Sequence, residues 1–256
     1  MRNYGLKFDE IKKEDYIFGG GQVPKEILQP DGDWSSFLPA KEFQNLNGVE
    51  PYACVTFTLL NCVETLIKRK YGLDRNYSDR FLAAISGTKE GGNSPQTVCE
   101  FLRKIGVVSQ ETWPFGPEIT TFEAFYSPIP PKLQALASEF NAEWDFLHDY
   151  VPTGHKDITE ALKCSPLLIS VSAWYENNGI YYRPEGMQDN HATTMFYERN
   201  GEFRRVFDSY DNPHIKDVAW ANIPMVVKRF WVQKKEKKST IWDFLRSLFG
   251  GIIKGV

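Results

Sequence analysis

The spacing of apolar residues changes near the middle of this chain, and that change restricts its fold more than any other feature. In residues 53–71, apolar side chains recur every three or four positions, as on one face of a helix: Phe57, Leu60, Val63 and Ile67. Beyond about residue 165, apolar residues come in short runs bounded by turn residues, which favours strands. A helical half followed by a strand-rich half predicts an α+β fold with two lobes.

Each half contains several such segments. Beyond 53–71, helices are expected at 79–85, 97–105, 132–147 and 157–163. Ser94 and Pro95 are suited to open the helix of 97–105 as N-cap and first residue, and Gly106 to end it. Strands are expected at 167–171, 180–182, 192–197, 204–207 and 226–232, and irregular structure at 1–47 and 114–131.

Composition excludes several classes of function. Of the 256 residues, 42% are hydrophobic, enough for a sizeable core. The formal net charge is −3 with both signs mixed, so no nucleic-acid partner is expected, because such proteins carry a basic patch. The four cysteines lack metal-ligand spacing, so we expect no metal site and no other cofactor.

The two ends of the chain bear on its location. Residues 1–7 contain no apolar signal segment, and a cytoplasmic or otherwise reducing location is expected. The basic run 234–238 is typical of a solvated linker. Residues 239–256 have an apolar helical stripe, which indicates a helix docked on its own domain. Alternatively, this helix attaches to a membrane surface or binds a protein partner.

Three residues could form a nucleophilic site. Cys54 lies at the start of a predicted helix, where unpaired N–H groups and the helix dipole lower the pKa of a thiol. His191 and Asp208 lie at the ends of two predicted neighbouring strands, so the carboxylate could orient the imidazole and favour its charged form. Singly, they could be a buried cysteine, a core histidine and a turn aspartate; together, they favour a Cys–His–Asp triad.

The chain also resembles the papain/cathepsin family of cysteine peptidases over about residues 33–232. In that family, His and Asn follow the nucleophilic Cys by roughly 130–150 residues, and His191 and Asp208 lie close to that range. Several short matches occur in family order: Asp33-Trp34, Cys54-Val55-Thr56-Phe57-Thr58, Gly91-Gly92, Gly106-Val107, Trp113-Pro114-Phe115, Ser170-Val171-Ser172, Gly179-Ile180-Tyr181, Asn190-His191-Ala192 and Asp208-Ser209-Tyr210.

This resemblance implies a papain-like two-lobed fold, with a helical left lobe, an antiparallel β right lobe and the active-site cleft between them. It divides the chain into an N-terminal extension (1–32), a peptidase domain (33–232), and a linker with a C-terminal amphipathic helix (233–256). Cys54 would attack a peptide carbonyl of a protein or peptide substrate, and His191 would protonate the leaving amine. The residues expected to bind the substrate are Gly91, Gly92, Asn93, Asn190 and Tyr210.

The sequence departs from the family pattern around the oxyanion hole. The family's Gln lies six residues before the Cys, where this chain has Gly48. Asn47 and Gln44 are therefore the two candidate donors. Asp208 replaces the family's usual Asn. The extension 1–32 is also much shorter than the usual inhibitory prosegment, which argues against zymogen control of that type.

Two other functions stay open at the level of sequence. One is a related amide hydrolase or acyl transferase, although Cys and His usually lie closer together in those families. The other is a structural or binding protein that retains a papain-like fold with little activity, which the uncertain oxyanion donor would allow.

Overall fold

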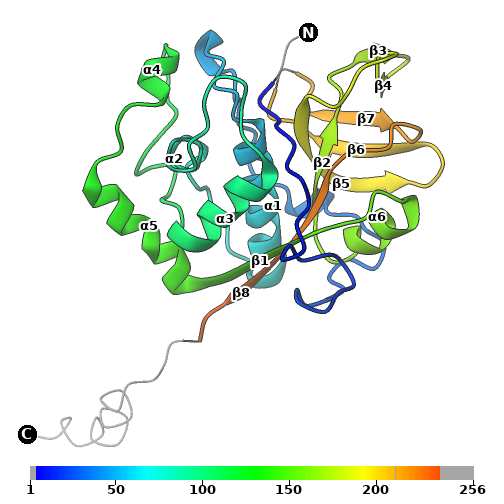
Figure 1. Ribbon diagram of the computed structural model, residues 1–256, viewed down its shortest axis with the longest axis horizontal. Helices are drawn as coiled ribbons and strands as arrows, with labels where there is room; N and C mark the ends of the chain where they lie inside the picture. The colour runs from blue at the N-terminus through cyan, green and yellow to red at the C-terminus, as the bar shows by residue number, and fades with distance from the viewer. Residues whose placement is uncertain (1–3, 211, 237–256) are drawn as a thin grey trace, which may run out of the picture.

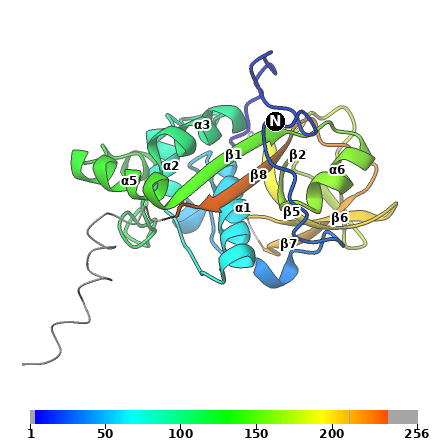
Figure 2. The ribbon, with the colours of Figure 1, turned by 90° about the horizontal axis from the view of Figure 1, so that it is seen from below.

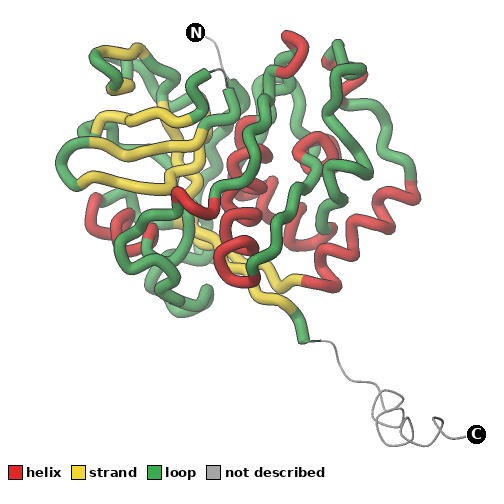
Figure 3. Tube along the Cα trace, turned by 180° about the vertical axis from the view of Figure 1, so that it is seen from behind, coloured by secondary structure: helices red, strands yellow, loops and turns green. Residues whose placement is uncertain are grey.

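The computed structural model describes residues 4–210 and 212–236 of the chain. Most of its helices lie on one side of the molecule and most of its strands on the other, with the helix His155–Leu162 on the strand side, which gives the two lobes expected from the sequence (Figure 3). The helices are η1 (Ser35–Phe37), η2 (Leu46–Gly48), α1 (Cys54–Tyr71), α2 (Asp79–Ile85), α3 (Pro95–Ile105), α4 (Phe122–Phe125), α5 (Pro131–Glu143) and α6 (His155–Leu162). The strands are β1 (Trp144–Tyr150), β2 (Leu167–Val171), β3 (Tyr175–Asn177), β4 (Ile180–Tyr182), β5 (His191–Arg199), β6 (Phe203–Phe207), β7 (Ile215–Ala219) and β8 (Val227–Lys234).

The long helix α1 lies at the junction of the lobes (Figure 1). Its side chains are buried from Cys54 to Ile67, and Leu59 and Val63 share one core cluster with Ile169 and Met195 of the sheet. Gly72 ends the helix in the left-handed conformation that glycine adopts without strain (φ 65°). Because α1 packs on both lobes, it fixes its own N-terminus relative to the strands.

The strands form one sheet in the order β1-β8-β2-β5-β6-β7-β4-β3. Neighbours pair antiparallel except β4 and β7, which are parallel. Strands β1 and β8 run side by side from the helical lobe to the β lobe (Figure 2), in register from Trp144↔Lys234 to Tyr150↔Lys228. This pair therefore joins the two lobes through backbone hydrogen bonds.

Several local predictions agree with the structure. The segments 79–85, 167–171 and 180–182 have the predicted bounds. Ser94 caps α3 by accepting a hydrogen bond from the Thr97 N–H, Pro95 is the first helical residue, and Gly106 follows the helix. The apolar spacing and cap chemistry of these segments are local, so they were readable in the sequence.

Other predictions were wrong. The helix expected at 132–147 ends at Glu143, and Trp144–Tyr150 is a strand because its pairing with distant β8 outweighs local helical spacing. The segment 114–131 contains the short helix α4, and strands β3 and β7 were not predicted. The helix expected at 239–256 lies outside the described residues. In residues 4–210 and 212–236, no helix has the length and apolarity needed to cross a membrane.

Candidate active site

Cys54 is the first residue of α1, and it is fully buried. The preceding residue, Ala53, has no side chain that could cap the helix. This N-cap residue therefore makes no side-chain hydrogen bond at the helix start, where the N–H groups of a first turn and the helix dipole favour a negative charge. A thiolate at Cys54 would lie in this favourable position.

His191 and Asp208 are brought together by the pairing of β5 with β6. His191 opens β5, Asp208 directly follows β6, and the register Thr194↔Phe207 places both at the same end of the two strands. The Nε2 atom of His191 lies 2.7 Å from Oδ1 of Asp208. Both residues are 1% exposed, so this contact is shielded from water.

The charge on His191 depends on Asp208 and Cys54. Burial alone would lower the pKa of the imidazole, but the Asp208 carboxylate and the Cys54 side chain outweigh it and raise this pKa to about 10. Burial likewise acts to raise the pKa of Asp208, but His191 and Lys216 bring it below its usual value. The imidazolium and carboxylate forms are therefore the favoured ones near neutral pH.

Sequence reasoning did not identify Lys216, on β7, as part of the site. Its Nζ atom lies 2.7 Å from Oδ2 of Asp208, so the carboxylate bridges a histidine and a lysine. The signal in the sequence was weak: one lysine between Ile215 and Asp217 in a short, unrecognised strand.

The two candidate oxyanion donors, Gln44 and Asn47, differ in burial and in hydrogen-bond partners. Gln44 is fully buried. Its backbone N–H donates to the Ser209 carbonyl (2.9 Å), and its side-chain Oε1 accepts from the Ser209 hydroxyl (3.1 Å). Its Nε2 donates to the carbonyl of Tyr4 (3.4 Å). In contrast, the exposed Asn47 uses its amide to hold another loop, donating to the carbonyls of Gly116 and Ile119. The two candidate amides therefore have different partners: the N-terminal segment for Gln44 and the loop 116–119 for Asn47.

The predicted substrate-binding residues contact the chain's own N-terminal segment, Tyr4–Lys7, called the strap below. The Tyr4 N–H donates to the carbonyl of Asn190 (3.1 Å). The Tyr4 ring packs edge-on against Tyr210 (4.9 Å between ring centroids) and against the catalytic candidate His191 (5.5 Å). The strap therefore covers the imidazole.

The next residues of the strap pair with the glycine loop. The Asn93 N–H donates to the Gly5 carbonyl and the Lys7 N–H donates to the Asn93 carbonyl, both at 3.0 Å, as in a parallel β-bridge. A Cβ at Gly92 would lie 1.9 Å from the Gly5 carbonyl oxygen, so the two backbones touch at a point that only glycine permits. Gly91 lies beside the Lys7 side chain. The glycine loop thus pairs with the backbone of the strap.

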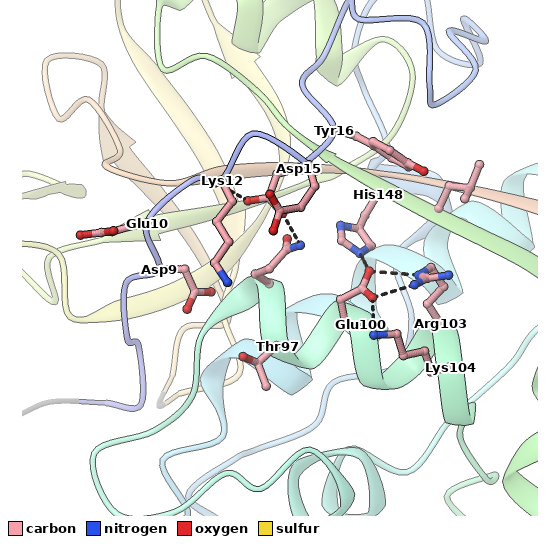
Figure 4. A pocket seen from close by; sticks show the side chains of 13 residues that line it. Asp9, Glu10, Lys12, Asp15, Tyr16, Thr97, Glu100, Arg103, Lys104 and His148 are labelled. Atoms are coloured by element: carbon pink, nitrogen blue, oxygen red, sulfur yellow. Dashed lines mark hydrogen bonds and ion pairs between the residues drawn. The ribbon is translucent and has the colours of Figure 1, made fainter.

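Beyond the strap, residues 9–16 border a separate cavity of about 540 Å³ against α3 and β1 (Figure 4). There, Nε2 of the buried His148 lies 3.1 Å from Glu100, and the Gln96 amide donates to Asp15 (2.8 Å). The pKa of His148 is lowered to about 4, mainly by burial. This cavity contains none of Cys54, His191 and Asp208. The hydrogen bond between Gln96 and Asp15 holds the N-terminal segment to α3.

The three other cysteines are also free and buried. Burial raises the pKa of Cys62, of Cys99 (to about 12) and of Cys164, which disfavours their thiolates. In the part of the chain that the structure describes, no group of three or more His, Cys, Asp and Glu side chains could hold a metal ion.

The sequence matches no known protein-family model and no curated protein at a significant level. Solved structures do match it. The fold is papain-like. Xylellain, a cysteine protease from Xylella fastidiosa, is 16% identical with a TM-score of 0.65, over 93% of this chain and 99% of that one. Procathepsin L 3 of Tenebrio molitor larval midgut is 12% identical with a TM-score of 0.61, over 89% of this chain and 75% of that one.

A third match is the proform of the ragweed pollen cysteine protease Amb a 11, at 13% identity and a TM-score of 0.55, over 83% of this chain and 67% of that one. At such identities, the likeness establishes the α+β papain-like fold and leaves the activity to be argued from the residues of the site.

Proposed function

We propose that this chain is a cysteine peptidase that hydrolyses peptide bonds through a Cys54 thiolate and a His191 imidazolium. One observation carries the proposal: Nε2 of the buried His191 is held by Asp208 at 2.7 Å. Cys54, at the start of α1, acts on the same imidazole, because it helps to raise the pKa of His191. The papain-like fold of the chain, shared with solved cysteine proteases, supports it. The substrate class that fits is a protein or peptide.

In the proposed mechanism, the Cys54 thiolate attacks the carbonyl carbon and forms a C–S bond. The Nε2 donor of Gln44 and the backbone N–H at the start of α1 stabilise the oxyanion. The imidazolium of His191 then gives its proton to the amide nitrogen, the C–N bond breaks, and the amine leaves. Water hydrolyses the thioester while His191 accepts a proton, which restores the thiolate–imidazolium pair.

The strap supports an extended substrate. Its backbone hydrogen bonds to Asn190 and Asn93 are of the kind that any peptide main chain can form. Gly92 leaves room for a backbone to approach. The strap must therefore leave the site before a substrate can bind there.

A thiol-reactive peptide probe tests the proposal. The full chain and a Gly5→Ala variant, whose new Cβ would collide with the Tyr52 backbone and displace the strap, are incubated with the probe, with and without the epoxide inhibitor E-64. We expect labelling that E-64 blocks, that Cys54→Ala abolishes and that Cys62→Ala leaves intact. No labelling of either chain at Cys54 would favour a binding protein with a papain-like fold. Labelling that survives Cys54→Ala would overturn the site.

A further inference from the structure

We infer that Lys216 is a positioning residue of the catalytic site: it acts through Asp208 to orient His191 and to limit the charge-stabilising effect of the carboxylate. The inference rests on the proposed function for its catalytic consequence. It starts from a cluster of three buried ionisable groups, His191, Asp208 and Lys216, which are 1%, 1% and 4% exposed.

The strand register brings Lys216 to this cluster. Strand β7 pairs with β6 so that Lys216 lies opposite Val206, two residues before Asp208. From there, Nζ of Lys216 contacts Oδ2 of Asp208 (2.7 Å) and the carbonyl of Tyr210 (3.1 Å). The ammonium also lies 5.5 Å and 5.9 Å from the ring centroids of Trp174 and Tyr181, a distance suited to cation–π attraction.

Both oxygens of Asp208 thus have partners. Oδ1 accepts from His191 and from the Tyr210 N–H (3.2 Å), and Oδ2 accepts from Lys216. A buried carboxylate oxygen without a donor is costly, so removing the ammonium would favour rotation or protonation of Asp208. Either change would weaken the bond that holds the imidazole. Lys216 therefore fixes which oxygen faces His191.

The charges of the cluster also explain why Asp208 can carry a carboxylate at a position where the papain/cathepsin family usually has the amide of Asn. With Asn at this position, thiolate and imidazolium would balance each other. Replacing Asn with Asp208 adds one buried negative charge, and Lys216 adds the positive charge that offsets it. The thiolate, imidazolium, carboxylate and ammonium then sum to zero, which lowers the cost of burying them together.

Several titratable groups face this cluster. Cys54 faces His191 from α1, and Tyr4 and Tyr210 lie edge-on to the imidazole. The Nδ1 atom of His214 lies 2.6 Å from the Asp208 carbonyl. Tyr181 completes the set, and its pKa is raised by burial and by Glu176 and Asp208. Among these groups, Lys216 alone forms an ion pair with Oδ2 of Asp208 in the described structure.

A double-mutant cycle on the full chain tests the inference, using Lys216→Met, Asp208→Asn and the combined variant. We expect each single change to lower kcat about tenfold or more. Because directly contacting residues couple, the double variant should have a higher kcat than either single variant. KM should stay within about threefold, since neither side chain contacts the substrate. An additive cycle, or a double variant slower than both single variants, would overturn the inference.

The pKa of His191, followed by NMR, is a readout that needs no activity. Losing Asp208 should lower this pKa by about one unit, and the double variant should fall between the wild type and Asp208→Asn. Losing Lys216 should shift it by about one unit, upward where Asp208 stays ionised against His191 and downward where Asp208 protonates or rotates away. An unchanged His191 pKa in Lys216→Met would also overturn the inference. If Lys216→Met fails to fold, the double variant, which leaves no unpaired charge, is compared with Asp208→Asn to give the effect of Lys216, and Lys216→Arg, which keeps the positive charge, serves as the control that should retain the wild-type His191 pKa. If the wild type hydrolyses nothing, the proposed function fails while the NMR shifts still test Lys216.

Discussion

At the scale of single residues, the site depends on differences between chemically similar side chains. Cys54 lies at a helix start beside an imidazole, whereas Cys62 lies two turns along the same buried helix and has a raised pKa. Gln44 and Asn47 carry the same amide, but only that of Gln44 is directed to the strap carbonyl beside His191. Residue type alone therefore does not assign these roles.

Replacing Gln44 with Ala should lower kcat about 10²–10³-fold, the typical cost of removing one oxyanion donor. KM should change much less, because the donor stabilises charge that develops in the transition state. The measurement is steady-state peptide hydrolysis. Asn47→Ala is the matched control and should leave kcat within a few-fold. If Asn47→Ala has the larger effect, the donor has been misassigned.

Asp208→Asn should remain active, while Asp208→Ala should lose far more activity at every pH. An amide oxygen can still accept the bond from His191 Nε2, and an alanine cannot. Since the carboxylate helps to raise the His191 pKa to about 10, the imidazolium of the wild type persists up to that pH and is lost above it. The alkaline limb of the rate should therefore move to lower pH in Asp208→Asn. Equal profiles for all three chains would show that Asp208 is a turn residue only.

The residues of the proposed site differ in how visible their positions were in the sequence. Cys54, His191 and Asp208 stand at element boundaries that local patterns reveal. Gln44 was ambiguous because neither it nor Asn47 lies at the family's spacing of six residues before the nucleophile Cys54. Lys216 was missed because its partner is set by the register of β6 and β7, which no local pattern encodes.

At the scale of elements, the strap and the long strand pair were the features least visible in the sequence. The strap has no periodicity of its own, and its conformation depends on contacts with Asn190 and Asn93, more than eighty residues away. Figure 1 shows this N-terminal segment running along the junction of the lobes. Strand β1 was mistaken for a helix end because β8, its partner, is equally remote along the chain. Local spacing cannot report such pairings.

Gly5→Ala should speed the labelling of Cys54 by a peptide probe. A Cβ at residue 5 would lie 2.1 Å from the Tyr52 carbonyl oxygen, and alanine strongly disfavours the φ of 115° found there. The strap would then leave the site. Gly21→Ala is the matched control, because Gly21 also has positive φ (84°) but an added Cβ would contact nothing within 4 Å. Equal labelling rates in wild type and Gly5→Ala would show that the strap does not limit access.

At the scale of the whole molecule, a buried ion pair links the N-terminal extension to both strands that join the lobes. Asp149 of β1 and Arg229 of β8 are 2% and 1% exposed, with Oδ2 and Nη2 2.6 Å apart. The guanidinium also donates to the carbonyls of Val23 and Pro24. Although residues 1–32 lie outside the region that resembles the family, their described part is thus bonded to the core.

Asp149→Ala should lower the free energy of unfolding by about 3–5 kcal/mol, because it leaves the Arg229 charge buried without its partner. The ion pair itself contributes less than this to the free energy of unfolding. Burial raises the pKa of Asp149 despite the adjacent guanidinium, so the cost of burying the carboxylate offsets part of the attraction. Urea unfolding measures the change. Asp217→Ala is the control: its pair with Arg205 is 37% and 21% exposed, so about 0–1 kcal/mol is expected. Equal losses in the two variants would mean that water reaches Arg229, and that the extension is not held to β8 by a shielded charge.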